Sequence, residues 1–216
     1  SSLAQANGGV AGQGKSGVAR EHIHFAGLHR GKTGLRGQRY KFDFFRVAQR
    51  GGCDGAADVH IDAGPFAIGV GGAKASQVTA DLEAIYNYAA KLPACNGKIV
   101  VGGFCWGGTQ TFRFATNNQN VKAAFVFYGS PPNDEDLAKI TSPVYGFYGS
   151  NDARINTTIP KTIELMKTAG KPFDPVTYEG AGHGFMKSGE DPAGSPENKK
   201  AREGAWIRLK AILAKL

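Results

Sequence analysis

Hydrophobic positions from about residue 76 onward recur first at a helical spacing and then in short unbroken runs. Between residues 76 and 89, apolar side chains at i, i+4, i+7, i+8 and i+11 predict an amphipathic helix. Proline and an Asn-Gly pair then predict a turn over residues 92–97. The apolar runs that follow predict buried strands at residues 98–104, 121–128, 143–148 and 175–178.

Helical segments are predicted between and after these strands. Residues 109–115 and 159–170 favour helices, and residues 134–140 favour a short polar helix or a loop. A last helix is expected to begin at Ser195 as N-cap, with Pro196 in its first position. The apolar face of this last helix includes Ala205, Leu209, Ile212, Leu213 and Leu216. Strands that alternate with helices predict an α/β fold, a mostly parallel sheet with helices on both faces.

Residues 1–77 differ from the rest of the chain. They hold 16 of the 31 glycines, and their apolar residues follow no clear period. Only residues 40–47, as a strand or helical turn, and residues 66–70, as a strand, are candidates for regular structure. We interpret residues 1–75 as a poorly readable first part of a single domain that spans residues 1–216. Two explanations stay open: strong divergence, or a written sequence that is not the one on which the fold was built, such as a shifted reading frame.

Composition narrows the functional classes. Hydrophobic content of 41% and charged content of 20% are typical of a globular domain, and no apolar run is long enough to span a bilayer. Residues 1–77 hold 10 Lys/Arg against 5 Asp/Glu, so they carry +5 of the net charge of +8. No basic helix or interleaved aromatic pattern accompanies this charge, so neither nucleic acid nor a membrane is an expected partner. Three cysteines do not make a disulfide scaffold.

Two motifs in the first part are interpreted as chance or surface features. Residues 9–16 match the phosphate-binding pattern G-x-x-x-x-G-K-[ST], but no buried strand precedes them and no helix start follows. A nucleotide binder is therefore a remote alternative. His22, His24 and His29 have no nearby carboxylate or cysteine to complete a metal site, so we expect surface histidines and no metal.

Cys105 lies where the predicted strand 98–104 passes through a glycine-rich turn into a helix. Gly103 and Gly107 flank it at two residues on either side, which is the pattern of a nucleophile elbow. A thiol at a helix N-terminus is expected to have a lowered pKa and to favour the reactive thiolate. The competing interpretation is a small buried cysteine beside a glycine bend.

Two further polar residues follow the ends of later predicted strands. Asp152 comes after strand 143–148, and His183 lies between glycines after strand 175–178. The carboxyl ends of parallel strands meet at one edge of a sheet, so both residues are expected near Cys105. In this arrangement His183 would take the thiol proton, Asp152 would orient the imidazole, and the backbone N–H of Trp106 would stabilise the oxyanion. Taken alone, Asp152 also fits a plain turn or cap residue.

These motifs, with the stretch 198–202 before the last helix, carry a family resemblance. Residues from about 76 to 216 resemble the dienelactone hydrolase family of the α/β-hydrolase fold. The resemblance rests on residues 103–108, 149–155 and 180–185. It implies a Cys-Asp-His triad, an acyl-enzyme at Cys105, no cofactor, and hydrolysis of a lactone or carboxylic ester, with a place in the degradation of aromatic compounds.

The resemblance also implies a substrate-binding set of Trp106, Phe185 and Lys187. Lys187 stands four residues after His183, and it is interpreted either as an anchor for an anionic substrate or as a solvated lysine. The family also has a loop that supplies a second oxyanion N–H, and a carboxylate that engages the resting cysteine. Neither is recognisable in residues 1–75.

The sequence predicts a hydrolase of a small lactone or carboxylic ester, acting as a monomer or homodimer. The alternatives are hydrolysis of another ester class, such as a thioester or organophosphate, and a non-catalytic protein with a hydrolase fold. A cytoplasmic protein is expected, or a periplasmic or secreted one if a signal peptide preceded Ser1.

Overall fold

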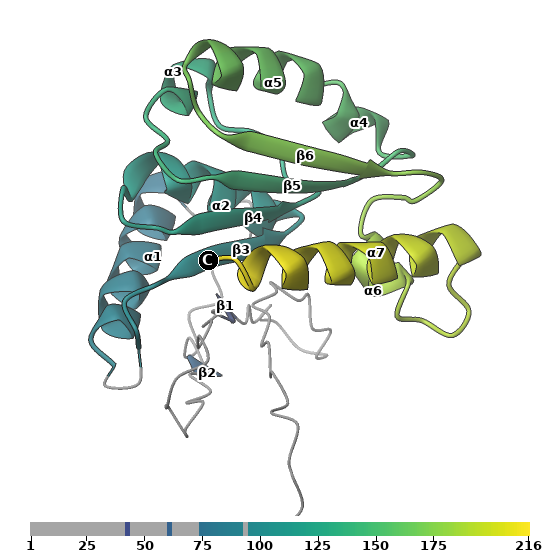
Figure 1. The fold of residues 1–216 in the computed structure, drawn as a ribbon, viewed down its shortest axis with the longest axis horizontal. Helices are drawn as coiled ribbons and strands as arrows, with labels where there is room; N and C mark the ends of the chain where they lie inside the picture. Colours follow the sequence, from purple (N-terminus) through teal and green to yellow (C-terminus); the bar gives the residue numbers. More distant parts are fainter. Residues whose placement is uncertain (1–41, 44–59, 62–73, 93–94) are drawn as a thin grey trace, which may run out of the picture.

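The computed structural model describes residues 42–43, 60–61, 74–92 and 95–216 (Figure 1). Strands β1 (Phe42–Asp43) and β2 (His60–Ile61) pair in antiparallel orientation, with Phe42 opposite Ile61. β1 lies within the candidate segment 40–47. The other features noted in the first part lie outside the described residues: the candidate strand 66–70, the motif at 9–16, His22, His24 and His29.

The described part of the chain contains a parallel sheet in the order β3-β4-β5-β6 (Figure 1). Its strands are β3 (Val100–Phe104), β4 (Ala123–Phe127), β5 (Val144–Gly149) and β6 (Phe173–Tyr178). All four were predicted from apolar runs. β6 begins two residues earlier than expected and contains Pro175. A proline is accommodated there because β6 lies at the edge of the described sheet.

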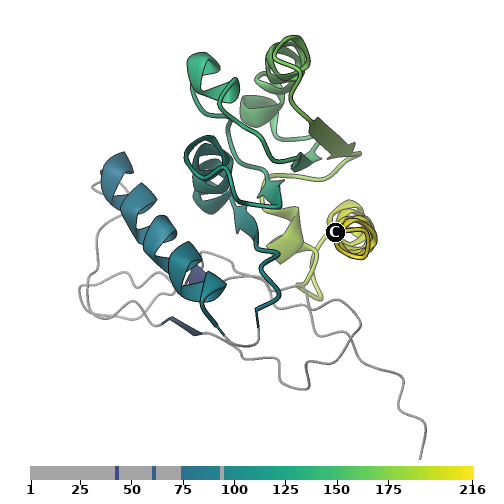
Figure 2. The ribbon, with the colours of Figure 1, turned by 60° about the vertical axis from the view of Figure 1, so that its left-hand side comes forward.

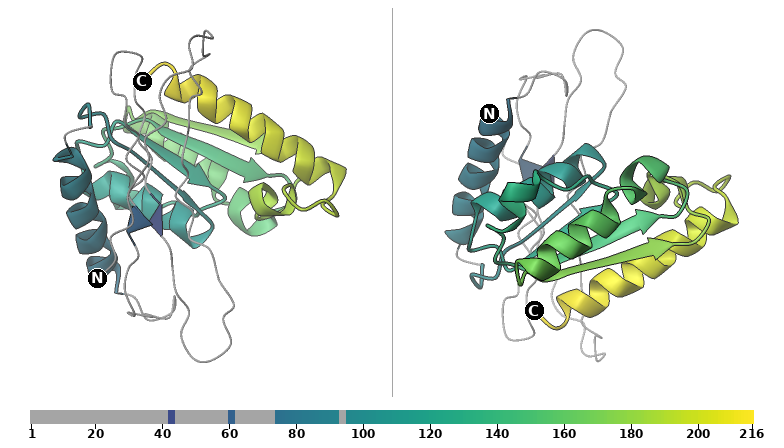
Figure 3. Two further views of the ribbon diagram at one scale, coloured as in Figure 1. Left: turned by 90° about the horizontal axis from the view of Figure 1, so that it is seen from below. Right: turned by 90° about the horizontal axis from the view of Figure 1, so that it is seen from above.

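One face of the sheet is covered by helices from the middle of the chain (Figures 2 and 3). These helices are α1 (Ala75–Ala90), α2 (Trp106–Asn117), α3 (Asp134–Leu137), α4 (Ala153–Asn156) and α5 (Ile159–Thr168). Val78, Phe112 and Met166 from this layer are buried together with Val101 and Val126 of the sheet. Burying a large apolar side chain contributes about 1.5–3 kcal/mol, so this layer fixes α2 against the strands.

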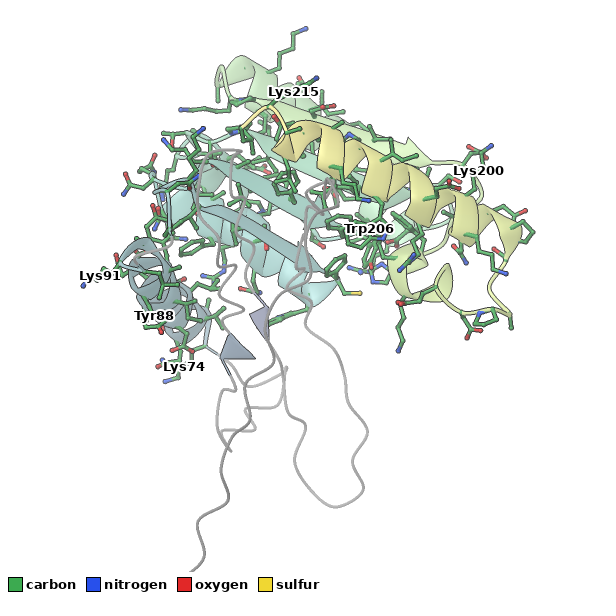
Figure 4. The ribbon with its side chains drawn as sticks, turned by 60° about the horizontal axis from the view of Figure 1, so that its bottom comes forward. Lys74, Tyr88, Lys91, Lys200, Trp206 and Lys215 are labelled. Atoms are coloured by element: carbon green, nitrogen blue, oxygen red, sulfur yellow. The ribbon has the colours of Figure 1, made fainter. Side chains whose placement is uncertain are left out.

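The opposite face of the sheet is covered by α7 (Pro196–Leu213), which α6 (Phe185–Ser188) precedes. The predicted cap is present, because Ser195 Oγ accepts the N–H of Asn198 at 3.3 Å. The predicted apolar face is also confirmed: Ala205, Leu209 and Leu213 are buried against the sheet. Figure 4 shows α7, with Lys200 and Trp206, at the side of the molecule opposite α1, which Lys74 and Lys91 flank.

Arg208 anchors α7 to the sheet. Its guanidinium donates to the carbonyl oxygens of Gly146 (2.8 Å) and Asp174 (2.6 Å), and its central carbon lies 4.5 Å from the centroid of the Phe147 ring. These contacts join α7 to β5 and β6, the two strands whose ends lead into the candidate site.

The predicted helices and the observed ones differ at three places. α2 begins at Trp106, three residues before the predicted start, because the glycines after Cys105 adopt helical geometry. α4 and α6 were not predicted, since four residues are too few to display a helical period. No helix within the described ranges combines the length and the apolar character needed to cross a membrane.

Candidate active site

Cys105 occupies the single residue between β3 and α2. Its backbone has φ 54° and ψ −121°, a conformation that costs a non-glycine residue about 1–3 kcal/mol. The N–H of Cys105 donates to the carbonyl oxygen of Phe127 at 3.1 Å, which ties the turn to β4. Its side chain is exposed. The strand, tight turn and helix expected around Cys105 are therefore present.

Close backbone packing explains the glycines of this turn. A Cβ atom at Gly103 would lie 2.3 Å from the carbonyl oxygen of Gly107, and one at Gly129 would lie 2.3 Å from the carbonyl carbon of Gly108. Real Cβ atoms do not approach so closely, so α2 can begin this near to β3 and β4 only over glycine. The glycines hold Cys105 at the carboxyl edge of the sheet.

Asp152 and His183 lie at the same edge, after β5 and β6. Asp152 Oδ2 is 2.5 Å from His183 Nδ1. The carboxylate side chain is only 7% exposed, whereas the histidine side chain is 37% exposed. A buried carboxylate bonded to Nδ1 leaves Nε2 as the nitrogen that can exchange protons with a reacting group.

Hydrogen bonds hold the Asp152 loop to the His183 loop. Ser150 Oγ accepts the N–H of Gly180 at 2.7 Å, and the N–H of Asn151 donates to the carbonyl oxygen of Ala181 at 2.9 Å. Because both loops are fixed to each other, the acid and the histidine form one preorganised pair.

Helix α7 also supports the histidine loop. Asn198, in its first turn, accepts the N–H of Gly182 through Oδ1 at 3.0 Å. The stretch 198–202, which forms part of the sequence resemblance, therefore has a structural role beside the candidate site.

The electrostatic surroundings of Cys105 correct one expectation. Although the side chain is partly accessible, displacement of water by the surrounding protein raises the pKa of the Cys105 thiol, and the negative charge of Asp152 raises it further. Arg154 and Lys187 lower the thiol pKa, but by less. The prediction of a lowered thiol pKa is wrong for this structure, because desolvation and the carboxylate of Asp152 outweigh the positive charges of Arg154 and Lys187.

The three residues predicted to bind substrate lie in different surroundings. Trp106 is the first residue of α2, so its N–H has no partner within the helix, and its side chain packs on the α1–α2 side of the sheet. Lys187 is exposed on α6, near enough to Cys105 to influence its thiol. Phe185 is fully buried, with its ring 5.4 Å from that of Tyr128. The Phe185 ring is not accessible in this structure, and substrate contact by Phe185 stays a prediction.

Two residues at this edge were missed from the sequence. Arg154 stands two residues after Asp152 and acts on the thiol, but a single exposed arginine gives no distinctive sequence signal. Tyr128 lies immediately after β4 and has a positive φ of 42°. The apolar run predicts it as the last residue of the strand 121–128, so no local signal marks it. Within the described ranges, no group of three or more His, Cys, Asp or Glu side chains could hold a metal ion.

A parallel sheet covered on both faces, with Cys105 in a tight turn between a strand and a helix and with an acid and a histidine after later strands, is the architecture of the α/β-hydrolase fold. The match to known families is more specific. The family model of the dienelactone hydrolase family matches residues 63–216, and the chain belongs to this family. The match begins 13 residues before the boundary at about residue 76 that the sequence motifs indicated.

Curated relatives carry related names. The chain is 36% identical over 146 residues to a protein of Methylorubrum extorquens named "Putative carboxymethylenebutenolidase", covering 62% of this chain and 49% of the relative. A protein of the same name from Salmonella typhimurium is 33% identical over 121 residues, covering 51% of this chain and 45% of the relative. The chain spans about half the length of the curated relatives it matches.

Solved structures agree with the fold. A structure titled "Putative Dienelactone Hydrolase", from Klebsiella pneumoniae, superposes with a TM-score of 0.58 at 27% identity, covering 66% of this chain and 62% of that chain. A dienelactone hydrolase-like phosphotriesterase from metagenomic libraries superposes with a TM-score of 0.57 at 19% identity, covering 65% of this chain and 62% of that chain. The second likeness concerns the fold alone.

Proposed function

We propose that this protein hydrolyses lactones or small carboxylic esters with Cys105 as nucleophile, His183 as general base and acid, and Asp152 as the residue that orients His183. The observation that carries the proposal is the hydrogen bond between His183 Nδ1 and the buried carboxylate of Asp152, at the sheet edge where Cys105 is displayed. Membership of the dienelactone hydrolase family supports the same reaction type.

Acylation begins with a neutral thiol, because the pKa of Cys105 is raised. His183 Nε2 takes the thiol proton as sulfur attacks the carbonyl carbon of the substrate. The tetrahedral intermediate collapses by breaking the bond from the carbonyl carbon to the alcohol oxygen, and His183 returns the proton to that oxygen. In a lactone this oxygen stays attached to the acyl group, so ring opening produces a hydroxyacyl thioester.

Deacylation uses the same groups in the opposite order. His183 removes a proton from water, the hydroxide attacks the thioester carbonyl, and the carbon–sulfur bond breaks. The proton returns to sulfur, which restores the thiol and releases the acid. In this proposal the backbone N–H of Trp106 bonds the oxyanion in both steps, a contribution of about 3 kcal/mol for one such donor.

Charge around the thiol supports an anionic substrate. Arg154 and Lys187 are exposed and come from the segments after β5 and β6, and each lowers the pKa of Cys105. A carboxylate on the substrate would pair with these cations while its ester group reaches the sulfur. The relatives' name denotes activity on a butenolide that carries a carboxymethylene group, which fits this charge.

A hydrolysis panel tests the proposal. The wild-type full chain and Cys105→Ala are assayed with p-nitrophenyl acetate, and with neutral and carboxylate-bearing butenolides. Thioester and organophosphate substrates are added to cover the alternative ester classes. We expect turnover by the wild type and none by Cys105→Ala, with preference for the carboxylate-bearing lactone. Equal rates for the two proteins, both folded by circular dichroism, would contradict the use of Cys105.

A further inference from the structure

Tyr128 stands out at the candidate site because its backbone is strained and its ring is buried. It is one of two non-glycine residues with positive φ in the described part of the chain, and the other is Cys105. Only 3% of Tyr128 is exposed. A bulky residue rarely adopts positive φ, so its side chain must gain contacts that a glycine in its place would lose.

The backbone on both sides of Tyr128 is fixed. Its N–H donates to the carbonyl oxygen of Phe147 on β5 at 2.8 Å. Two residues later, the N–H of Ser130 donates to Thr109 Oγ1 of α2 at 2.9 Å. Gly129, between them, packs directly on the backbone of Gly108. The strained turn is therefore held between the strand that precedes Asp152 and the helix that follows Cys105.

The ring of Tyr128 reaches the histidine. Its centroid lies 5.0 Å from that of His183 with an interplanar angle of 60°, an edge-to-face arrangement. The Tyr128 ring also contacts the Phe185 ring, with the ring centroids 5.4 Å apart and an interplanar angle of 72°. The backbone of Met186 lowers the pKa of the Tyr128 phenol, but by less than burial raises it. A negative charge on Cys105 also acts to raise the pKa of Tyr128.

We propose that Tyr128 is a positioning residue, whose ring supports the His183 imidazole so that Nδ1 faces Asp152 and Nε2 is directed to the Cys105 side. The inference rests on the proposed function of these three residues. Asp152 fixes one nitrogen, but a single hydrogen bond leaves the imidazole free to rotate about the bond axis. An aromatic ring packed against the imidazole removes this freedom.

The ring, rather than the hydroxyl, is the part of Tyr128 that acts in this proposal. Burial raises the pKa of Tyr128, so the phenol stays neutral and is no proton donor in the working range of the site. Phenylalanine should therefore replace Tyr128 with little loss. An aliphatic residue at position 128 should lower the activity, because it lacks the ring.

The test compares Tyr128→Phe, Tyr128→Leu and the matched control Tyr178→Leu in the full chain. Tyr178 also packs on Phe185, at 5.2 Å, but no ring contact joins it to His183 within the described residues. We expect Tyr128→Phe to keep kcat within threefold, and Tyr128→Leu to lower kcat at least tenfold with KM within threefold. Tyr178→Leu should keep wild-type kcat.

A second readout is the pH profile of Cys105 alkylation by iodoacetamide, followed by peptide mass spectrometry. We expect Tyr128→Leu to shift the midpoint of this profile by at least half a pH unit, because a loosened imidazole no longer shares the thiol proton. Tyr128→Phe and Tyr178→Leu should keep the wild-type midpoint. If Tyr128→Leu does not fold, Tyr128→Met, with an unbranched chain of similar length, replaces it in the comparison.

The inference fails if the folded aliphatic variant retains both the kcat and the alkylation profile of the wild type, or if Tyr178→Leu has the same effect. Failure of the proposed function has a different signature, namely equal ester hydrolysis by wild type and Cys105→Ala. In that case the alkylation profile still decides whether Tyr128 controls the histidine, because it needs no substrate.

Discussion

Asp152 Oδ2 and His183 Nδ1 lie 2.5 Å apart although 31 positions separate the two residues in the chain. Their loops bond to each other through Ser150 and Gly180 and through Asn151 and Ala181. The acid and the histidine are thus held as a unit by β5 and β6, independently of the turn that displays Cys105.

The first prediction concerns the carboxylate. Asp152→Asn should leave the fold intact but lower kcat about 10³–10⁴-fold, because an amide cannot stabilise the imidazolium or select the same tautomer. Steady-state ester hydrolysis measures the effect. Asp134→Asn is the matched control, since Asp134 is an exposed acid on α3 that pairs with Lys161. If Asp152→Asn retains wild-type kcat, Asp152 does not orient the base.

The second prediction concerns the charges that act on the Cys105 thiol. Removing a cation should raise the thiol pKa, so Lys187→Gln and Arg154→Gln should each move the alkylation midpoint to higher pH. Removing the anion should do the opposite, so Asp152→Asn should move it to lower pH. Peptide-resolved alkylation of Cys105 from pH 6 to pH 11, at about half-unit steps, measures the direction of each midpoint shift. Lys139→Gln serves as control, because Lys139 pairs with Asp136 on α3; a shift of equal size there would mean that the effect is not local.

The third prediction concerns the backbone packing of the elbow. Gly103→Ala should lower the free energy of unfolding by about 1–3 kcal/mol, because its methyl group would meet the carbonyl oxygen of Gly107. Gly182→Ala is the control: a Cβ atom there meets no described atom within 4 Å, and its φ is not positive. Urea unfolding followed by circular dichroism compares the two. Similar midpoints for both variants would contradict the close approach of α2 to β3.

The fourth prediction concerns the support from α7. Asn198→Ala removes the acceptor of the Gly182 N–H, which should cost about 1 kcal/mol and loosen the His183 loop. Asn198→Asp keeps an oxygen in this place, so it should retain more activity and more protection than the alanine variant. Hydrogen exchange at Gly182 and ester hydrolysis measure the two effects. The role of Asn198 would be refuted by unchanged exchange at Gly182 in Asn198→Ala.

Much of the fold from α1 onward could be predicted from the sequence. β4 is apolar and buried throughout, as expected for a parallel strand covered on both faces, and α7 has a cap and a buried stripe that are visible in its residues. The positions of Cys105, Asp152 and His183 at one sheet edge followed from the ends of these strands.

Other features depend on packing that no local pattern displays. Phe185 lies next to the site in sequence, yet its ring points into the core against Tyr128. The raised pKa of Cys105 results from protein atoms and a carboxylate that other segments supply. The strain at Tyr128 is also invisible in sequence, because the residue follows an ordinary apolar strand.

The order of the strands has a geometric consequence. Cys105 follows β3 and Asp152 follows β5, and β4 lies between them. Two neighbour spacings in a sheet separate these backbones by about 9–10 Å. This gap is too wide for a carboxylate to reach a thiol directly, but it is wide enough for an imidazole. Strand β4 therefore sets a separation at which the proposed mechanism needs the His183 imidazole as the group that exchanges a proton with Cys105.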